Sequence, residues 1–315
     1  MIERFTLTPE RYAQVARFAL WTLGLIVLTG AAVRVTGSGL GCPTWPKCTE
    51  TSLYTELNTH GVIEFANRAL TSVVGFAALA GFAGAFRRRP YRKDLVALGA
   101  LLPLGVLAQI VLGGFTVRYD LAPGLVMSHY LLSMAILVGA VALDWRAHRE
   151  PDQRCVTNDR LLGWGVRALL ALGAITIIAG TAATAAGPHA GGAGTGDVIK
   201  RLDFKGAETL SFVISQHSKL AAALGLLAVS LWVLAGRRGA PAPQRRALTV
   251  VCVLLGAQGA LGGVQYELEL PAEIVWVHVA LAAGTWVALL LAVASFGRLQ
   301  PRPARARGGR EAAAA

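Results

Sequence analysis

The chain has 315 residues, of which 54% are hydrophobic and 15% are charged. Soluble globular domains carry about 25% charged residues, so this composition excludes an ordinary soluble protein. The net charge of +12 does not indicate nucleic-acid binding, because the basic residues are confined to segments between long apolar blocks. The sequence is therefore typical of a multi-pass membrane protein.

Eight apolar blocks are each long enough to cross about 30 Å of hydrocarbon as a helix, which takes roughly 20 residues. No cleavage site of small residues clearly follows the first block, so we interpret it as a membrane helix rather than a signal peptide. The predicted helices cover about residues 17–34, 61–86, 95–116, 124–145, 162–186, 208–235, 247–265 and 273–297.

Arginine and lysine gather in alternate connections, at 87–93, 146–160 and 237–246, and in the C-terminal tail. By the positive-inside rule these connections and both termini lie in the cytoplasm. Orientation and contact with anionic membrane lipids then explain the basic excess. We expect the tail 301–315, which is rich in proline, arginine, glycine and alanine, to be disordered and cytoplasmic.

One motif occurs twice, with an offset of 149 positions. Leu112-Gly-Gly-Phe115 ends one apolar block and His129 lies in the next; Leu261-Gly-Gly-Val264 and His278 repeat this arrangement. A shift of about 150 residues also aligns much of the remaining chain. A tandem duplication that places a histidine inside the membrane twice predicts a pair of buried ligand sites.

The repeat also predicts the architecture. Each half holds four helices, so both halves begin on the same side and are related by an axis along the membrane normal. We expect an all-α integral membrane protein of two pseudo-symmetric four-helix bundles. Residues 1–150 would form the N-terminal bundle and residues 151–300 the C-terminal bundle.

The C-terminal half holds two histidines at matched depth. His217 lies about two turns into the sixth helix and His278 about one and a half turns into the eighth, and both helices enter from the same side. Either histidine alone could be a hydrogen-bonding residue between helices. The pair fits bis-imidazole ligation of haem iron in a four-helix bundle. Zinc would need further ligands, which this half lacks at that depth.

The N-terminal half differs at this site. His129 matches His278, but Asn67 stands where the other half has His217. His60 lies on the same helix face as Asn67, about two turns above it. The first half therefore has one clear candidate ligand, His129, and a second candidate, His60, nearer the membrane surface.

Glu64 is a carboxylate within an apolar helix and shares the face of His60 and Asn67. A carboxylate in this position is unfavourable in the membrane and by default indicates a functional site. The structural alternative is an ion pair with Arg68, one turn further along the helix.

The four cysteines divide by side of the membrane. Cys42 and Cys48 lie in the first external connection, where an oxidising compartment permits a disulfide or a redox-active pair; two free thiols are the alternative. Cys155 is predicted to be cytoplasmic and Cys252 lies inside the seventh helix. We expect no chemical role for either.

Together these residues resemble the haem A synthases, which supply the haem of haem-A-containing terminal oxidases. The resemblance covers essentially the whole membrane region. It is carried by Thr36–Cys42, by Trp45 and Cys48, by Ile63-Glu64 and Asn67-Arg68, by Leu112-Gly-Gly with His129, and by the His217/His278 pair.

The resemblance implies that the C-terminal bundle carries haem b on His217 and His278. The N-terminal bundle would receive haem O, with His129 on its iron, and oxidise the C8 methyl group to a formyl group by successive hydroxylations through a hydroxymethyl intermediate. It implies that Glu64 is the catalytic residue. The product, haem A, would supply cytochrome c oxidase.

Two departures from the family pattern stand out. The usual Glu-x-x-His of the second helix is Glu64-Phe-Ala-Asn67 here, so either His60 replaces the missing ligand or His129 holds the substrate haem alone. The cysteine pair that some members carry in the third external connection is absent from 187–196.

Three further residues lie close to the inferred haem level. Arg34 and Arg118 lie at the outer ends of their helices and could pair with haem propionates or extend to the interface as ordinary interfacial arginines. For His189 in the third external connection we expect a solvated loop residue rather than a propionate contact.

Two other classes of function fit part of the pattern. A di-haem b electron-transfer cytochrome or quinol oxidoreductase would explain paired histidines, but Glu64 and the unequal halves argue against it. A transporter with repeated halves is disfavoured because no helix is broken at matching positions. Haem O synthase, the upstream farnesyltransferase, and the assembly of cytochrome oxidase in the cell membrane are the expected partners. The electron acceptor or donor and the oligomeric state stay open.

Overall fold

The computed structural model describes residues 6–55, 57–153, 155–192 and 194–299, so the predicted tail 301–315 lies outside the described residues. The described residues form eight helices that are long and apolar enough to cross a membrane. They confirm the predicted all-α membrane fold. The helices are α1 Pro9–Val35, α2 Thr59–Arg87, α3 Lys93–Arg118, α4 Pro123–Ala147, α5 Arg160–Ala186, α6 Thr209–Arg237, α7 Ala242–Glu267 and α8 Ala272–Phe296.

The lengths of the helices repeat from one half to the next. α1 and α5 have 27 residues each, α2 and α6 have 29, α3 and α7 have 26, and α4 and α8 have 25. Four predicted spans thus reappear in order with equal lengths. The tandem repeat seen in the sequence is a repeat of structure.

The start of the first helix corrects the prediction. The helix begins at Pro9 rather than near residue 17, because the Thr8 hydroxyl accepts a hydrogen bond from the backbone N–H of Arg11 and Pro9 occupies the first helical position. A polar capping signal therefore extends α1 by about two turns beyond its apolar block.

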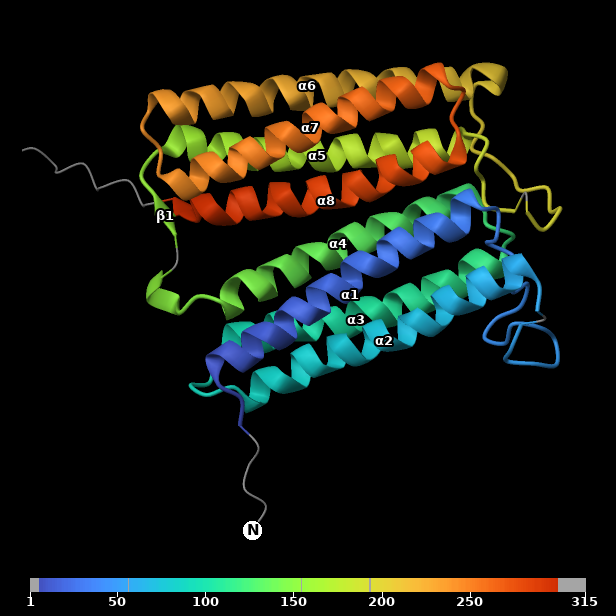
Figure 1. Ribbon diagram of the computed structural model, residues 1–315, viewed down its shortest axis with the longest axis horizontal. Coiled ribbons are helices and arrows are strands. Elements are labelled where there is room, and N and C mark those ends of the chain that lie inside the picture. Colours follow the sequence, from blue (N-terminus) through green and yellow to red (C-terminus); the bar gives the residue numbers. More distant parts are fainter. Residues whose placement is uncertain (1–5, 56, 154, 193, 300–315) are drawn as a thin grey trace, which may run out of the picture.

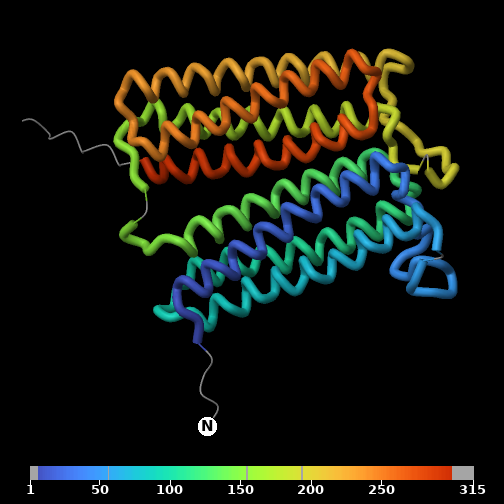
Figure 2. The backbone as a smooth tube through the Cα atoms, viewed as in Figure 1, coloured from blue at the N-terminus to red at the C-terminus, as the bar shows by residue number. Residues whose placement is uncertain are grey.

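The helices form two four-helix bundles side by side, α1–α4 and α5–α8 (Figures 1 and 2). Within each bundle, neighbours in sequence pack together, and the first helix closes on the fourth. Between the bundles, α8 packs on α1 and α4, and α4 packs on α5. The first and fourth helices of each half therefore build the shared core.

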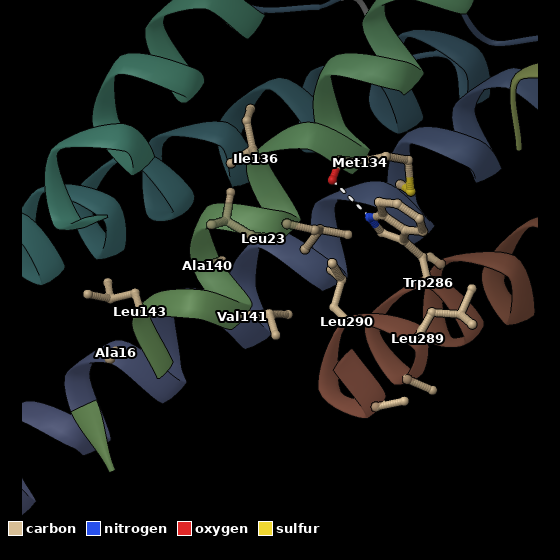
Figure 3. Close-up of a cluster of buried hydrophobic side chains, with 14 of the residues drawn as sticks. Ala16, Leu23, Met134, Ile136, Ala140, Val141, Leu143, Trp286, Leu289 and Leu290 are labelled. Carbon is tan, nitrogen blue, oxygen red and sulfur yellow. Dashed lines mark hydrogen bonds between the residues drawn. The ribbon is translucent and has the colours of Figure 1, made fainter. Parts of the chain in front are cut away.

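Two tryptophans of α8 anchor this interface. The indole N–H of Trp286 donates to the backbone oxygen of Met134 in α4 at 3.0 Å (Figure 3), and that of Trp276 donates to the oxygen of Leu28 in α1 at 2.9 Å. A buried indole needs such a partner for its N–H. Trp286 is surrounded by buried aliphatic residues of α4 and α8, so the two bundles share one hydrophobic core.

The turn that leads into the last helix of each half is also repeated. Asp120 and Leu121 before α4, and Glu269 and Leu270 before α8, all have positive φ angles between 48° and 65°. Non-glycine residues seldom adopt this conformation, so its recurrence at matching positions reflects a shared backbone requirement. The turn sets the start of the helix that carries His129 or His278.

The short elements tie the halves together. The 3₁₀ turn Pro151–Gln153 and strand β1 Val156–Thr157 follow α4, a second 3₁₀ turn, Gly206–Glu208, precedes α6, and β1 pairs in parallel with β2 Arg298–Leu299 after α8. The amide of Arg298 also donates to the carbonyl of Cys155 at 3.0 Å. The linker between the bundles is thus fastened to the end of the last helix.

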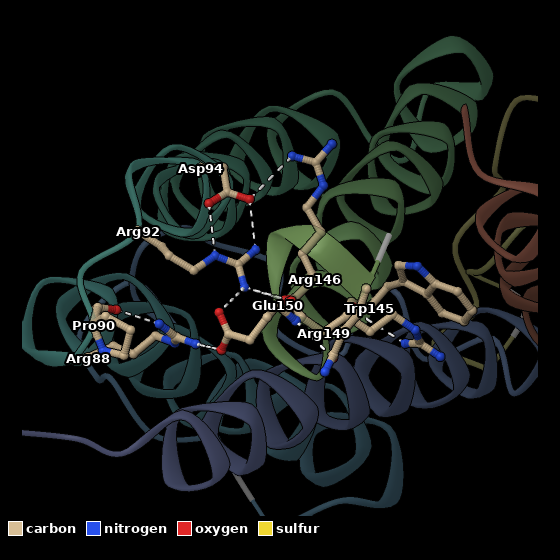
Figure 4. Close-up of polar contacts among 9 residues, drawn as sticks. Arg88, Pro90, Arg92, Asp94, Trp145, Arg146, Arg149 and Glu150 are labelled. Atoms are coloured by element: carbon tan, nitrogen blue, oxygen red, sulfur yellow. Dashed lines mark hydrogen bonds and ion pairs between the residues drawn. The ribbon is translucent and has the colours of Figure 1, made fainter. Parts of the chain in front are cut away.

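Ion pairs fill the basic end of the N-terminal bundle (Figure 4). Arg88 is fully buried and pairs with Glu150, while Arg92 pairs with Asp94 at 2.9 Å. Arg146 approaches the same Asp94 carboxylate at 3.8 Å. These arginines are therefore matched by acidic residues of the same bundle.

Candidate functional site

In the C-terminal bundle, His217 of α6 and His278 of α8 face each other. Their ring centroids are 6.4 Å apart and the rings are inclined by 71°. The Nδ1 atom of His217 lies 3.0 Å from the backbone oxygen of Thr176, which can only accept, so Nδ1 carries the proton. The other ring nitrogen, Nε2, is then free to act as a metal ligand, as is usual when Nδ1 donates to a carbonyl.

A glycine lies against the imidazole ring of each of these two histidines. A Cβ atom built on Gly180 of α5 would lie 3.0 Å from Cε1 of His217, and one built on Gly262 of α7 would lie 3.3 Å from Cε1 of His278. Both distances are shorter than ordinary van der Waals contact, so a larger residue would displace the imidazole. The first glycine of the repeated Leu-Gly-Gly motif thus serves the histidine that follows it in the next helix.

Haem fits this pair of residues better than a bare metal ion. The ring separation leaves room for one metal between two imidazoles, with metal–nitrogen bonds of about 2.0–2.1 Å. Among the described residues no group of three or more His, Cys, Asp or Glu side chains could hold a metal ion. Two axial imidazoles are the ligands expected when a porphyrin supplies the remaining ligands. Nδ1 of His278 is also buried without a partner in the described structure.

His129 of α4 repeats the environment of His278. A Cβ on Gly113 would lie 3.3 Å from its Cε1, the same distance as for Gly262 and His278, and its Nδ1 is likewise buried without a described partner. The structure therefore places His129 and His278 in equivalent positions, as the offset of 149 predicts.

Two glutamines that were not among the predicted site residues support these histidine helices. The amide of Gln109 donates to the backbone oxygen of His129 at 2.9 Å and to the hydroxyl of Ser133 at 2.5 Å. Gln258, once its amide is turned to satisfy both neighbours, donates to the backbone oxygen of His278 at 3.3 Å. The offset between them is again 149, so the repeat itself was a signal that could have identified them.

At the position that matches His217, α2 carries an amide, Asn67, rather than an imidazole. The Oδ1 atom of Asn67 accepts a hydrogen bond from the hydroxyl of Thr29 in α1 at 2.7 Å. A Cβ on Gly30, the counterpart of Gly180, would meet nothing within 4 Å. The close contact of His217 with Gly180 in one half therefore has no counterpart at Gly30 in the other.

His60 is held between two connections at the same end of the bundles. Its Nδ1 lies 2.8 Å from the hydroxyl of Ser38, and a Cβ on Gly194 would lie 2.1 Å from its Cε1. The ring is thus enclosed between the α1–α2 and α5–α6 connections, each of which closes one bundle. This placement separates His60 from the level of Asn67, and His60 links the two halves.

The buried carboxylate of Glu64, 5% exposed, is shared between Arg68 and the first external connection. Oε2 accepts from the backbone N–H of Cys42 at 2.7 Å, and Oε1 accepts from two nitrogens of Arg68 at 3.1 and 2.5 Å. Arg68 in turn donates to the backbone oxygens of Cys42 at 2.7 Å and of Thr44 at 2.9 Å. The ion pair with Arg68, which was the structural alternative for Glu64, is present, and Arg68 also holds the cysteine-containing connection.

Cys42 and Cys48 lie at disulfide-bonding distance, with Cα atoms 4.3 Å apart, and both are buried. Between them Trp45 leans on α3, where a Cβ on Gly114 would lie 2.8 Å from its ring. Gly113 therefore lies against the ring of His129, and Gly114 lies against the ring of Trp45. The matching Gly263 of the C-terminal half would meet nothing within 4 Å.

The remaining predicted contacts are partly corrected. The guanidinium of Arg34 donates to the backbone oxygens of Thr184 at 3.1 Å and His189 at 3.0 Å, so it joins α1 to the end of α5 instead of extending to the membrane interface. His189 is not a solvated residue, because its ring donates to the oxygen of Leu270 at 2.7 Å and is half-buried. Arg118 is exposed at the end of α3.

The fold and site define a class of protein: a multi-pass membrane protein of two repeated four-helix bundles, with a facing histidine pair in one bundle and a buried glutamate in the other. The family model of the cytochrome oxidase assembly proteins, COX15-CtaA, matches residues 14–293. The chain belongs to this family.

Curated relatives include a heme A synthase of Lysinibacillus sphaericus, 28% identical over 144 residues, which are 44% of this chain and 47% of that protein. A heme A synthase of Geobacillus kaustophilus is 33% identical over 135 residues, 40% of this chain and 41% of the relative. A protoheme IX farnesyltransferase of Thermus thermophilus is 28% identical over 307 residues, 92% of this chain and 49% of the relative. The chain thus spans half or less of the length of these relatives.

Proposed function

We propose that this protein is a haem A synthase, an oxidoreductase acting on CH or CH₂ groups. It oxidises the C8 methyl group of haem O to a formyl group by successive hydroxylations through a hydroxymethyl intermediate, followed by loss of water. The observation that carries the proposal is the inequality of the bundles: one has a facing histidine pair, and the other has His129, Asn67 at the position that matches His217, and a buried Glu64. Relatives named heme A synthase support it.

The C-terminal bundle is the proposed haem b site, where His217 and His278 would hold the haem iron. When bound, haem b would supply reversible one-electron transfer. The chain orients the ligands: the Thr176 carbonyl sets the tautomer of His217, and Gly180 and Gly262 hold the rings in place. A ligand that is already oriented loses less freedom when the cofactor binds.

The N-terminal bundle is the proposed substrate site, with His129 as the protein ligand of haem O. Asn67 leaves the opposite position without an imidazole, and His60 is engaged with Ser38. We therefore assign the substrate haem to His129 and assign His60 to the contact between external connections. If His129 is the only protein ligand of the haem O iron, the iron keeps a free coordination position. A free position suits oxidation of the substrate better than a second imidazole would.

Glu64 is the proposed catalytic residue. Its carboxylate is buried, charged groups are unfavourable at this depth, and the matching residue in the other bundle is Ile214. Glu64 would accept a proton as the methyl group is oxidised, or stabilise positive charge that develops on its carbon. Arg68 and the amide of Cys42 hold both oxygens, so they fix the direction in which the carboxylate acts.

The protein is proposed to lie in the plasma membrane with both termini in the cytoplasm. The basic connections lie at one end of the bundles, as the positive-inside rule requires of a cytoplasmic face. Cys42 and Cys48 then face an oxidising compartment, where a disulfide is stable.

Haem O synthase is the proposed upstream partner, and cytochrome oxidase assembly the destination of haem A. A relative named for farnesyl transfer aligns with 92% of this chain through 49% of its own length. A haem made by farnesyl transfer is poorly soluble in water, which favours direct transfer between two membrane enzymes. The alternative of a di-haem b electron-transfer cytochrome is not favoured, because such a protein would need a complete histidine pair in each bundle.

The decisive experiment is co-expression of the chain with a source of haem O, followed by extraction of the haems and identification by mass. We expect haem A and a trace of the hydroxymethyl intermediate, alongside haem b. The same cells with an empty vector control for background synthesis. Recovery of haem O and haem b without haem A would contradict the proposed activity.

A further inference from the structure

The basic end of the C-terminal bundle differs from that of the N-terminal bundle. Between the end of α6 and the start of α7 lies a groove of about 610 Å³. Its lining is Trp232, Val233, Gly236, Arg237, Ala242, Arg245, Arg246 and Thr249. Three arginines and no acidic residue line it, whereas Asp94 and Glu150 offset the arginines of the other bundle.

The three arginines of the groove are not matched within the protein. The side chains of Arg237, Arg245 and Arg246 make no hydrogen bond or ion pair with any residue that the structure describes. The neighbouring Arg238 is different, since it pairs with Asp159 at 3.0 Å. Three exposed guanidinium groups around one groove repel each other and give it a positive electrostatic potential. An anion bound there would be stabilised.

The start of α7 adds to this positive potential. Its N-cap is Pro241, without a side-chain hydrogen bond, and its first turn contains no acidic residue. Pro243 has no N–H, and the N–H of Gln244 donates to the backbone oxygen of Pro241 at 3.0 Å. The positive end of the helix dipole and the N–H of Ala242 therefore lie beside Arg245 and Arg246 instead of beside a carboxylate. A helix start of this kind, with arginines around it, suits a phosphate group.

An apolar path leads from the groove into the membrane-spanning part of the bundle. Leu226, Val229 and Val233 of α6 and Val250 and Val253 of α7 are all exposed on the two helices that frame it. Trp232 lies at the level of the arginines, with its indole N–H donating to the hydroxyl of Thr249 at 2.9 Å. Tryptophan is typical of the level of lipid headgroups, so the groove lies where a phospholipid presents its phosphate.

We propose that the groove between α6 and α7 binds one anionic phospholipid, with its headgroup phosphate on Arg237, Arg245 and Arg246 and its acyl chains along the exposed aliphatic residues of both helices. Basic pockets between membrane helices are a recurrent form of binding site for anionic lipid headgroups. The lipid would neutralise the arginines in the first turns of α7, and would fasten α7 to α6 at this end.

The test uses the full chain in detergent and native mass spectrometry. Phosphatidylglycerol is titrated against phosphatidylethanolamine with the same acyl chains. We expect one phosphatidylglycerol to be retained in preference to phosphatidylethanolamine. The variant Arg237→Gln/Arg245→Gln/Arg246→Gln should bind phosphatidylglycerol about tenfold to a hundredfold more weakly, because three charge contacts are lost.

A matched variant removes the same charge from the same end of the other bundle: Arg11→Gln/Arg87→Gln/Lys93→Gln. It should bind phosphatidylglycerol as the unaltered chain does. A charge-preserving variant, with lysine at the three groove positions, should retain most of the binding, and melting temperatures check that all variants are folded. If the groove variant is unfolded, Arg246→Gln alone should show an intermediate loss.

Two results would overturn the proposal. Equal phosphatidylglycerol binding by the groove variant and the matched variant would mean that the arginines of the groove do not hold the lipid. Displacement of phosphatidylglycerol by an excess of inorganic phosphate would identify a site for free anions instead of a lipid site. Neither result bears on haem A formation, so this test is separate from that of the proposed function.

Discussion

In the C-terminal bundle, α6 and α8 each direct one imidazole towards the other, and a glycine lies behind each ring. In the N-terminal bundle the corresponding helices present Asn67 and His129, and Glu64 replaces an aliphatic residue one turn away. The helices that carry these residues have equal lengths in the two halves. The backbone of the duplication has been kept while the residues at its centres have changed.

This comparison separates the features of the proposed haem-binding bundle from those of the proposed catalytic bundle. The features common to both halves are the histidine of the fourth helix, its glycine seat and the glutamine behind it. Other features occur in one half each. The C-terminal bundle has the second imidazole, and the N-terminal bundle has the carboxylate with its cysteine-containing connection. Substitutions that exchange these features test the assignment of roles.

The largest effect is expected for Glu64→Gln, which keeps the shape of the side chain but removes its charge. Haem A formation should fall by at least about a hundredfold, the usual contribution of an acid–base group, while haem b content stays near normal. Extracted haems identified by mass provide the measurement. Ile214→Gln, the matching change in the other bundle, should leave haem A formation largely intact. Undiminished haem A in Glu64→Gln would reduce Glu64 to a structural partner of Arg68.

His217→Ala and His278→Ala should each remove or convert the low-spin signal of the proposed haem b, since one axial ligand is lost. Optical and electron paramagnetic resonance spectra of the purified variants measure this. His129→Ala should keep the low-spin signal and lose haem A. Normal low-spin spectra in both C-terminal variants would refute the assignment of the pair.

Asn67→His makes the two centres alike by adding the missing imidazole. In the other bundle the matching imidazole, that of His217, lies against Gly180, and Gly30 is the counterpart of that glycine. We expect a second low-spin species when the variant is supplied with haem O, visible in the same spectra. A variant that binds haem O with the spectrum of the unaltered chain would show that position 67 does not face the substrate haem.

A smaller effect separates Gly180→Ala from Gly30→Ala. The new Cβ at position 180 would lie 3.0 Å from Cε1 of His217, whereas at position 30 it would meet nothing within 4 Å. An imidazole forced from its rotamer loses about 0.5–1.5 kcal/mol, so haem b affinity should fall about two- to tenfold in Gly180→Ala and not in Gly30→Ala. Haem titration of the purified variants gives both affinities.

The smallest effect concerns the connection held by Glu64. Thiol labelling before and after reduction should find Cys42 and Cys48 linked in the externally exposed state. Serine at both positions should lower the free energy of unfolding by about 2–3 kcal/mol or less, because the closed loop is short. Full labelling without a reductant would contradict the link.

Much of this protein follows from local sequence. The eight spans, the tandem repeat and the matched depth of His217 and His278 all depend on residue spacing along helices, which a period of 3.6 residues and a membrane of fixed thickness determine. The ion pair of Glu64 with Arg68 is also local, since the two residues are one helical turn apart. The start of α1 was missed because its cap is polar and lies outside the apolar block.

Tertiary structure decided the contacts between elements that are distant in sequence. Arg34 lies on carbonyls of Thr184 and His189, His60 lies beneath the third external connection, and Cys42 donates its backbone N–H to Glu64. Composition does not encode which carbonyl a guanidinium will reach, because that depends on how the external connections fold over the bundles. The sequence by itself thus determined which residues lie at each depth of the membrane, and the packing of two bundles decided which of them meet.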